Sequence, residues 1–343
     1  MLYPILKALC RTSIQCYFSD IEFNRKDNVP EGQTPVIFAA NHQSAFLDAI
    51  LLAVFSKEPI YFLARSDVFK GALGKFLRAI NMMPIYRMLD GINKLSLNDA
   101  IFAKCSELLK ENKRILIFPE GSQKDLAYLR PLTKGVVRIA MNTQLELDKE
   151  IKIVPFGINY FNSYHSGHKL ILSYGTPISV PPFLDEFKFH QNKGYRALIN
   201  VVSEGIKDQL LIPEKTDDYQ SKLKVFNRKN ENVQFDSLRK QIADGSFKTN
   251  TKTHSWVKLI KYLLYIPNLP AIGILTFILG KTSNKHFVAS MKVAFGALIF
   301  PPWLLLCFIG VMIFCGIKWA VIVLFVQYFS MYLVPKVSRW SRV

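Results

Sequence analysis

The sequence predicts an α/β domain, with a largely parallel central sheet flanked by helices, followed by transmembrane helices at its C-terminal end. Short strand-like runs alternate with helical spacing between residues 34 and 211, which is typical of a parallel sheet whose crossovers are helices. Beyond residue 255 long runs carry no charged side chain. These patterns divide the 343 residues into a globular part and a membrane part.

Each expected strand is rich in β-branched or aromatic residues, and each expected helix has apolar side chains three or four positions apart. The expected strands are 34–40, 60–64, 83–86, 114–118, 152–158 and 169–174. The expected helices are 45–55, 71–80, 95–110, 133–145 and 194–211. We expect Pro155, in the run VPFG at 154–157, to interrupt its strand, because proline donates no ladder hydrogen bond.

The first 20 residues mix apolar side chains with Lys7 and Arg11. The apolar core is short and no cleavage site is convincing, so we do not expect a secretory signal. We expect residues 1–20 to form an amphipathic helix lying on a membrane, with an ordinary core helix as the alternative. We place a domain at 21–212 and a polar, helical or partly disordered connector at 213–255.

The region 256–343 contains three runs without a charge, at 262–280, 293–317 and 319–335. About 20 apolar residues span a bilayer, so 293–335 predicts a transmembrane hairpin that turns near 316–318. The first run contains Pro267, Asn268 and Pro270, which break helices, so it is an interfacial, re-entrant or third membrane segment. A buried helix pair in a soluble domain is the alternative interpretation.

Positive side chains flank these runs on both sides, and the positive-inside rule therefore places both flanks, and the globular domain, in the cytoplasm. The flanking cations are Lys258, Lys261, Lys281, Lys285, Lys292, Lys336, Arg339 and Arg342.

A formal charge of +18 arises from 44 Lys+Arg against 26 Asp+Glu, and half of the chain is hydrophobic. This composition excludes disorder and favours an anionic partner, which is nucleic acid, anionic lipid or a phosphorylated substrate. No nucleic-acid module surrounds the basic, aromatic stretch 183–195, so we expect no nucleic-acid partner. Five cysteines without a C-x-x-C pair predict no disulfide framework. His165 and His168 lack a nearby Glu, so we expect no metal site.

His42 directly follows the expected strand 34–40, and Asp48 comes six residues later on the first turns of the next helix. The carboxyl ends of strands are where α/β sheets place ligands. If the loop curls back, Asp48 can orient the imidazole, and His42 can then act as a general base. The spacing alone also fits a structural histidine.

Three further segments adjoin expected strands: MPIYR at 83–87, FPEGS at 118–122 and VPFG at 154–157. Together with NHQSAFLD at 41–48, they resemble the four sequence blocks of the phospholipid/glycerol acyltransferase family, in that family's order, over about residues 30 to 160. The C-terminal region looks like that of a subgroup of glycerol-3-phosphate and 1-acylglycerol-3-phosphate acyltransferases. The resemblance implies transfer of a fatty acyl group from a thioester to a glycerol phosphate hydroxyl.

The resemblance also implies residue roles. His42 would be the general base, Asp48 its orienting partner and Arg87 a contact to the glycerol phosphate. Further contributions to that pocket would come from the third block, through Glu120, Gly121 and Ser122. Pro155 would belong to the block that shapes the acyl or thioester site.

The chain departs from the family pattern at Gln123, where many members have arginine. Nearby cations could supply the missing charge: Lys124, Arg130 or Lys134, with Arg65 and Lys70 as further candidates for substrate binding. Each has an alternative as a solvated or membrane-facing charge.

We expect no cofactor, since acyl-CoA or acyl carrier protein would bring the acyl group as co-substrate. The first choice of acceptor is 1-acyl-sn-glycerol-3-phosphate, also called lysophosphatidic acid, which would give phosphatidic acid. Glycerol-3-phosphate, acylated at sn-1, is the alternative. A non-catalytic lipid-binding membrane protein that retains the fold is a second alternative, but it would not need both His42 and Asp48.

Overall fold

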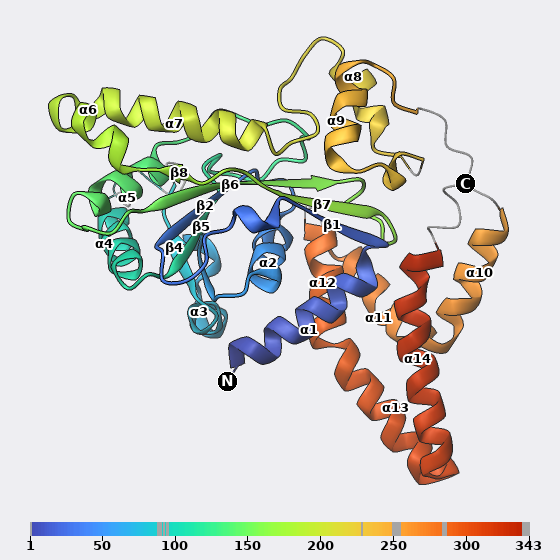
Figure 1. The fold of residues 1–343 in the computed structure, drawn as a ribbon. Coiled ribbons are helices and arrows are strands. Elements are labelled where there is room, and N and C mark those ends of the chain that lie inside the picture. Colours follow the sequence, from blue (N-terminus) through green and yellow to red (C-terminus); the bar gives the residue numbers. More distant parts are fainter. Residues whose placement is uncertain are drawn as a thin grey trace.

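A computed structural model of the chain describes residues 2–87, 91, 93, 96–227, 229–248, 255–282 and 287–337. A central sheet carries helices on both faces, and an arm of apolar helices projects away from it (Figure 1). The alternation of strand and helix predicted this α/β architecture, and the prediction is confirmed.

Within the described residues, the sheet has eight strands in the order β1-β7-β6-β2-β5-β3-β4, and β8 pairs with β6. Neighbouring strands are parallel except at the β6–β7 and β6–β8 pairs, so the sheet is largely parallel as expected. The strands are β1 (Asp20–Asn24), β2 (Val36–Ala40), β3 (Ile60–Arg65), β4 (Met82–Ile85), β5 (Arg114–Ile117), β6 (Lys152–Tyr160), β7 (Lys169–Tyr174) and β8 (Ile178–Ser179).

The two faces of the sheet carry different helices because side chains alternate along each strand. On β2, Phe38 and Ala40 face one core, formed with α1 (Leu2–Tyr17), α2 (Ala45–Phe55), α3 (Gly71–Ala79) and α12 (Val288–Leu298). Ile37 and Ala39 face the other core, formed with α4 (Leu97–Lys110), α5 (Gly135–Gln144), α6 (Leu184–Phe189) and α7 (Gln191–Lys207). The helix expected at 95–110 is α4, which begins at Leu97. Leu95 lies outside the described residues.

Pro155 does not interrupt its strand, so that expectation is wrong. It lies within β6 opposite Ala39 of β2, at the gap between the ladders that β6 makes with β8 and with β7. On that edge its carbonyl oxygen accepts from the Gly175 N–H at 2.8 Å. No ladder partner faces the missing proline N–H, and the strand continues.

Residues 213–248 form α8 (Tyr219–Lys222), α9 (Phe235–Ala243) and three-residue 3₁₀ turns at Leu223–Val225 and Asn230–Asn232. Phe235 and Leu238 of α9 are fully buried. They lie in one cluster with Phe161, which directly follows β6, and Ile171, which belongs to β7. This polar segment therefore contributes its own small core next to β7.

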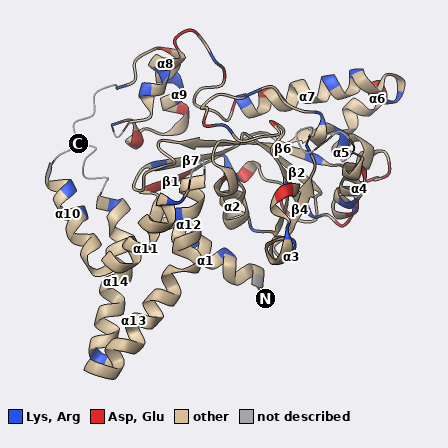
Figure 2. Ribbon diagram, turned by 180° about the vertical axis from the view of Figure 1, so that it is seen from behind, with Lys and Arg blue, Asp and Glu red and all other residues tan. Residues whose placement is uncertain are grey.

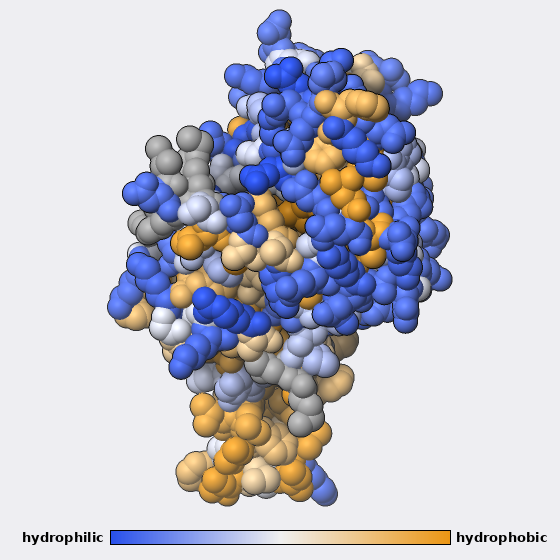
Figure 3. All heavy atoms as spheres, turned by 90° about the vertical axis from the view of Figure 1, so that its left-hand side faces the viewer, coloured by the Kyte–Doolittle hydropathy of each residue, from blue (hydrophilic) through white to orange (hydrophobic). Residues whose placement is uncertain are grey.

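The C-terminal region consists of α10 (Ser255–Tyr265), a 3₁₀ turn (Ile266–Asn268), α11 (Leu269–Gly280), α12, α13 (Phe300–Cys315) and α14 (Ile317–Val337). Among the described residues, Trp256–Gly280, Val288–Cys315 and Ile317–Val337 are long and apolar enough to cross a membrane. Hydrophobic side chains cover the projecting arm (Figure 3).

The expected hairpin turn is present, because Gly316 adopts a φ of +86° between α13 and α14. Lys318 lies beside this turn, and charged residues are otherwise sparse along the two helices (Figure 2). Pro267 and Pro270 are the second residues of the 3₁₀ turn and of α11, and proline is tolerated in the first turn of a helix. Trp256–Gly280 therefore qualifies as a third candidate span. Lys285, Arg339 and Arg342 lie outside the described residues.

Candidate active site

The loop after β2 is fixed by Asn41, whose side chain continues the sheet where the backbone leaves it. Its Nδ2 donates to the Ile158 carbonyl at 3.0 Å, and its Oδ1 accepts from the Ile158 N–H at 2.8 Å. Asn41 is buried. This amide pair ties the end of β2 to β6 and so fixes the start of the loop that carries His42.

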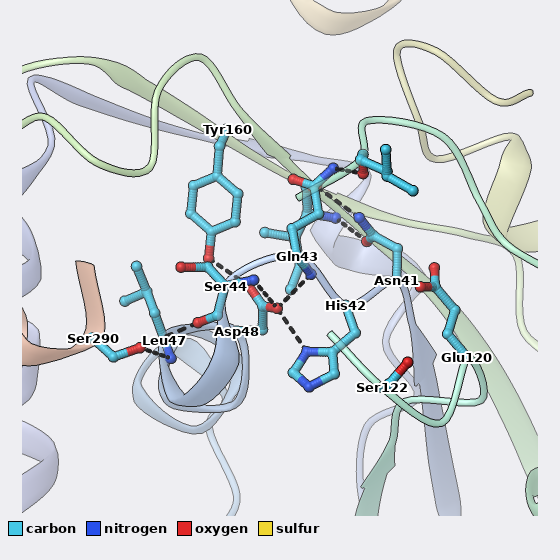
Figure 4. Close-up of polar contacts among 12 residues, drawn as sticks. Asn41, His42, Gln43, Ser44, Leu47, Asp48, Glu120, Ser122, Tyr160 and Ser290 are labelled. Atoms are coloured by element: carbon cyan, nitrogen blue, oxygen red, sulfur yellow. Dashed lines mark hydrogen bonds and ion pairs between the residues drawn. The ribbon is translucent and has the colours of Figure 1, made fainter. Parts of the chain in front are cut away.

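His42 and Asp48 are in contact, as the sequence predicted. The imidazole Nδ1 lies 2.8 Å from Asp48 Oδ2 (Figure 4). The same Oδ2 accepts from the backbone N–H groups of Gln43 at 2.8 Å and Ser44 at 2.7 Å. Ala45, at the start of α2, has a φ of +44°, and this left-handed residue lets the chain curl back.

Tyr160 completes the surroundings of Asp48 by donating its hydroxyl to Oδ1 at 2.6 Å. Burial, together with the nearby Asp48 carboxylate, raises the pKa of Tyr160 well above its ordinary value, so the phenol stays a neutral donor. Asp48 has no exposed surface. Its partners are all donors, which offsets the desolvation of an ionised carboxylate.

The orientation of His42 follows from these contacts. An ionised carboxylate only accepts, so Nδ1 carries the proton and Nε2 is left as the acceptor. The ring stacks on Phe118, with centroids 4.1 Å apart, and the side chain is 14% exposed. A buried carboxylate, a fixed ring and one accessible nitrogen are the requirements of a general base.

The loop after β5 forms the neighbouring wall. Gly121 adopts a φ of +73° in the turn that carries Glu120 and Ser122. Arg130 pairs with Glu120 and also donates to Ser122 Oγ at 3.0 Å. Burial raises the pKa of Glu120, and the guanidinium of Arg130 opposes that shift. Arg130 is thus the cation that holds the FPEGS segment together.

A cavity of about 580 Å³ opens beside His42, and its lining includes Arg65, Arg87, Glu120 and Asn98. Asn98 donates to the Tyr86 carbonyl and accepts from its N–H, at 2.8 and 2.9 Å, which fixes the segment before Arg87. Gly121 and Ser122 line the same cavity. The expected phosphate-site residues Arg87, Glu120, Gly121 and Ser122 are therefore brought together with His42.

The other sequence-derived candidates differ in position. Arg65 lines the cavity but also forms a bidentate contact with Asp67. Lys134 donates to Asn192 of α7 at 3.1 Å, and neither it nor Arg130 belongs to the cavity lining.

Pro155, expected at the acyl site, also lies outside the cavity lining. It packs against Gly175 and Gly205, and a Cβ on Gly205 would lie only 2.6 Å from the proline ring. Gly157 in the same block lies against the Gln209 backbone. The VPFG segment therefore forms the part of the sheet on which α7 and Gln209 pack.

A second cavity of about 390 Å³ adjoins the first and is almost wholly apolar. The two share five lining residues, Phe46, Phe62, Val68, Met82 and Phe287. Its walls are α1, α2, α3 and α12. The site is therefore polar beside His42 and apolar where it continues toward α12, the first part of a candidate membrane span.

Sequence reasoning included Asn41 in the block at 41–48 without giving it a role, and it did not identify Tyr160 as part of this site. Tyr160 ends β6, and a polar end to a buried strand was the only available signal. Within the described residues, no three His, Cys, Asp or Glu side chains are grouped to hold a metal ion.

Residues 20–159 match the sequence model of the family described as Acyltransferase. This match assigns the segment 20–159 to the acyltransferase family. It is 32% identical over 112 residues to the Saccharomyces cerevisiae protein named glycerol-3-phosphate O-acyltransferase 1, covering 31% of this chain and 15% of that one. It is 30% identical over 133 residues to 1-acyl-sn-glycerol-3-phosphate acyltransferase LPAT1, chloroplastic, of Arabidopsis thaliana, covering 38% and 35%.

A bacterial relative is matched over more of its length. The Helicobacter pylori protein named 1-acyl-sn-glycerol-3-phosphate acyltransferase is 26% identical over 193 residues, which cover 54% of this chain and 78% of that one. The chain thus spans only 15% and 35% of the length of the yeast and Arabidopsis relatives. Both family blocks that meet at the cavity, around His42 and around Glu120, lie inside the matched domain.

Proposed function

We propose that the protein is a membrane-bound glycerophospholipid acyltransferase that transfers a fatty acyl group from a thioester to 1-acyl-sn-glycerol-3-phosphate and so makes phosphatidic acid. One observation carries the proposal. The His42–Asp48 pair, at 2.8 Å, lies beside the cavity lined by Arg87 and Arg65, and this cavity adjoins the second, apolar cavity, called the apolar groove below. A phosphate fits the first part, and fatty chains fit the second.

The chemistry follows from the geometry. The acceptor hydroxyl lies between Nε2 of His42 and the thioester carbonyl. Nε2 takes the hydroxyl proton while the oxygen forms the new bond to the carbonyl carbon. The carbon–sulfur bond then breaks, the imidazolium returns the proton to the thiolate, and an ester and a free thiol result. Asp48 stabilises the imidazolium formed in between.

The acceptor hydroxyl is the nucleophile in this scheme, so the protein supplies none. Ser122 lines the cavity, and its hydroxyl oxygen accepts a hydrogen bond from Arg130. It is not paired with His42, as a serine nucleophile would be. A direct transfer to the acceptor therefore accounts for the side chains present in the cavity better than a covalent acyl-enzyme.

The lipid acceptor is favoured by the position of the groove. Its wall α12 begins the candidate span Val288–Cys315, so a chain that leaves the groove meets the lipid-facing helices. Two of the relatives carry the 1-acyl-sn-glycerol-3-phosphate acyltransferase name. The yeast relative, named for glycerol-3-phosphate, supports glycerol-3-phosphate as the second candidate acceptor.

We also propose that the domain faces the cytoplasm. Lys281 and Lys292 precede the α13–α14 hairpin, and Lys336 lies at its end. Cytoplasmic flanks of membrane segments carry the excess of lysine and arginine. A cysteine introduced on the exposed surface of α7 should be labelled by an impermeant thiol reagent only after the cytoplasmic face is opened. Labelling from the other face would overturn this orientation.

The activity is tested with the full chain in nanodiscs. Acyl-CoA and acyl carrier protein thioesters are each offered with 1-acyl-sn-glycerol-3-phosphate or with glycerol-3-phosphate, and the labelled product is identified. His42→Ala should lower the rate by about 10²–10⁴-fold, whereas His165→Ala, at an exposed position, should not change it. Acylation of neither acceptor, or an unchanged rate for His42→Ala, would overturn the proposal.

A further inference from the structure

The membrane region touches the catalytic loop directly, through helix α12. This helix packs on α1 and α2, as the ribbon also shows (Figure 1). Ser290 on α12 is buried, with 5% of its surface exposed. It lies 131 residues beyond the family-matched segment that ends at residue 159.

The Ser290 hydroxyl makes two hydrogen bonds to the turn that begins α2. Its Oγ accepts from the Leu47 N–H at 3.0 Å and donates to the Ser44 carbonyl at 3.2 Å. The close-up shows Ser290 approaching from α12 on the far side of the turn from His42 (Figure 4). The Leu47 N–H also donates to the Ser44 carbonyl at 3.0 Å. A single side chain on another helix thus contacts both the donor and the acceptor that close the first turn of α2.

That turn also holds the catalytic pair. Gln43 and Ser44 direct their N–H groups to Asp48, and Ala45 between Ser44 and Leu47 has a φ of +44°. A non-glycine residue in this region of backbone conformation is under strain and persists only where its surroundings fix it. Ser290 contacts the turn on both sides of the strained residue.

We propose that Ser290 is a positioning residue: it fixes the strained turn at Ser44–Leu47 and thereby holds Asp48 and His42 in reactive geometry. The inference rests on the proposed acyl transfer and adds a residue from outside the family domain to it. Because α12 is the first part of the candidate span Val288–Cys315, the seating of that span supports the catalytic pair. Small displacements of reacting groups lower rates steeply.

The chain provides a matched control at the same helix contact. Ser13 of α1 is also buried, and its Oγ donates to the Val293 carbonyl of α12 at 2.8 Å. Ser13→Ala therefore removes a buried serine hydroxyl that holds α12 without touching the turn. Ser290→Thr keeps the hydroxyl, and the added methyl has room because Ser290 borders the apolar cavity.

The test compares the full chain with Ser290→Ala, Ser290→Thr and Ser13→Ala in nanodiscs. For Ser290→Ala we expect kcat to fall by about 10-fold while KM for the acceptor changes by less than about twofold. Ser290→Thr should restore kcat, and Ser13→Ala should leave it unchanged. Hydrogen exchange should quicken in the peptide that contains residues 43–49 for Ser290→Ala alone.

The outcomes separate this inference from the proposed function. An unmodified chain that acylates neither acceptor overturns the proposed function, while the exchange measurement still decides whether Ser290 fixes the turn. If Ser290→Ala keeps full kcat, or if exchange at 43–49 is unchanged, the positioning role is wrong. Equal losses in Ser290→Ala and Ser13→Ala would show that the serine only docks α12, which also overturns it.

Discussion

Asp48→Asn isolates the charge of the catalytic pair from its geometry. Oδ2 of Asp48 accepts from His42, Gln43 and Ser44, whereas Oδ1 accepts only from Tyr160. An asparagine therefore places its carbonyl oxygen at the Oδ2 position and its amide toward the Tyr160 oxygen, which can accept. The contacts at the Oδ2 position are preserved, and His42 keeps its proton on Nδ1. The negative charge is lost, and the contact with Tyr160 reverses direction, so the phenol O–H loses its acceptor.

The size of the effect follows from the contact distance. Two unit charges about 4 Å apart interact by about 4 kcal/mol at an effective dielectric constant of about 20. Since the imidazolium exists only during the reaction, this energy is lost in the transition state and not in the free enzyme. About 1.4 kcal/mol corresponds to a tenfold change in rate, so kcat should fall by roughly 10³-fold.

The assay measures kcat and the dissociation constant of the acceptor for Asp48→Asn in nanodiscs. We expect the acceptor to bind with its original affinity and the thermal midpoint to stay close to that of the unmodified chain. A kcat within about tenfold of the unmodified value would refute the role given to the Asp48 charge. Loss of acceptor binding would instead show that the carboxylate shapes the pocket.

Three further predictions concern the surroundings of this pair. Tyr160→Phe removes the donor to Asp48 Oδ1 and should lower kcat by about tenfold, since a hydrogen bond to a charged group contributes about 1.5–3 kcal/mol; an unchanged kcat would show that the contact is dispensable. Burial raises the pKa of Glu120, so the folded state binds the carboxyl proton of Glu120 more tightly than the unfolded chain does. Proton binding to Glu120 therefore stabilises the fold at low pH, and this stabilisation falls as pH rises above the ordinary pKa of 4.5. The thermal midpoint of Glu120→Gln should therefore decline less than that of the unmodified chain between about pH 4 and pH 7, and parallel declines would contradict this. Ala294→Leu narrows the apolar groove and should shift preference toward shorter acyl thioesters in competition assays. Gly310→Leu, at a position where an added Cβ meets nothing within 4 Å, should not. Equal chain-length preferences in both variants would show that the groove does not bind the acyl chain.

The sequence was sufficient to predict the parts of the site that depend on local chain geometry. His42 and Asp48 are six residues apart beside a buried strand, so a single turn brings them together. The strands were recognisable because each is a short apolar run. The weakly patterned strand β1, with sequence DIEFN, was missed, because a polar edge strand lacks the signal of a buried one.

Contacts between distant residues required the tertiary structure. Asp48 meets Tyr160 because the sheet order places β6 next to β2. The turn meets Ser290 because α12 returns to the same face of the sheet. Several cations lie near the FPEGS segment in the sequence. The folded loop shows that Arg130 is the one that pairs with Glu120.

The sequence by itself determined the α/β class, the His42–Asp48 pair and the apolar helices, because each is encoded in the spacing of residues close along the chain. The tertiary structure alone decided what surrounds the pair: a tyrosine 112 residues from Asp48, a serine on α12, and a groove bounded by four helices. These depend on strand order and helix docking, which residue periodicity does not specify. Burial then gives the contacts their effect, since a carboxylate removed from water requires the donors that only the assembled fold supplies.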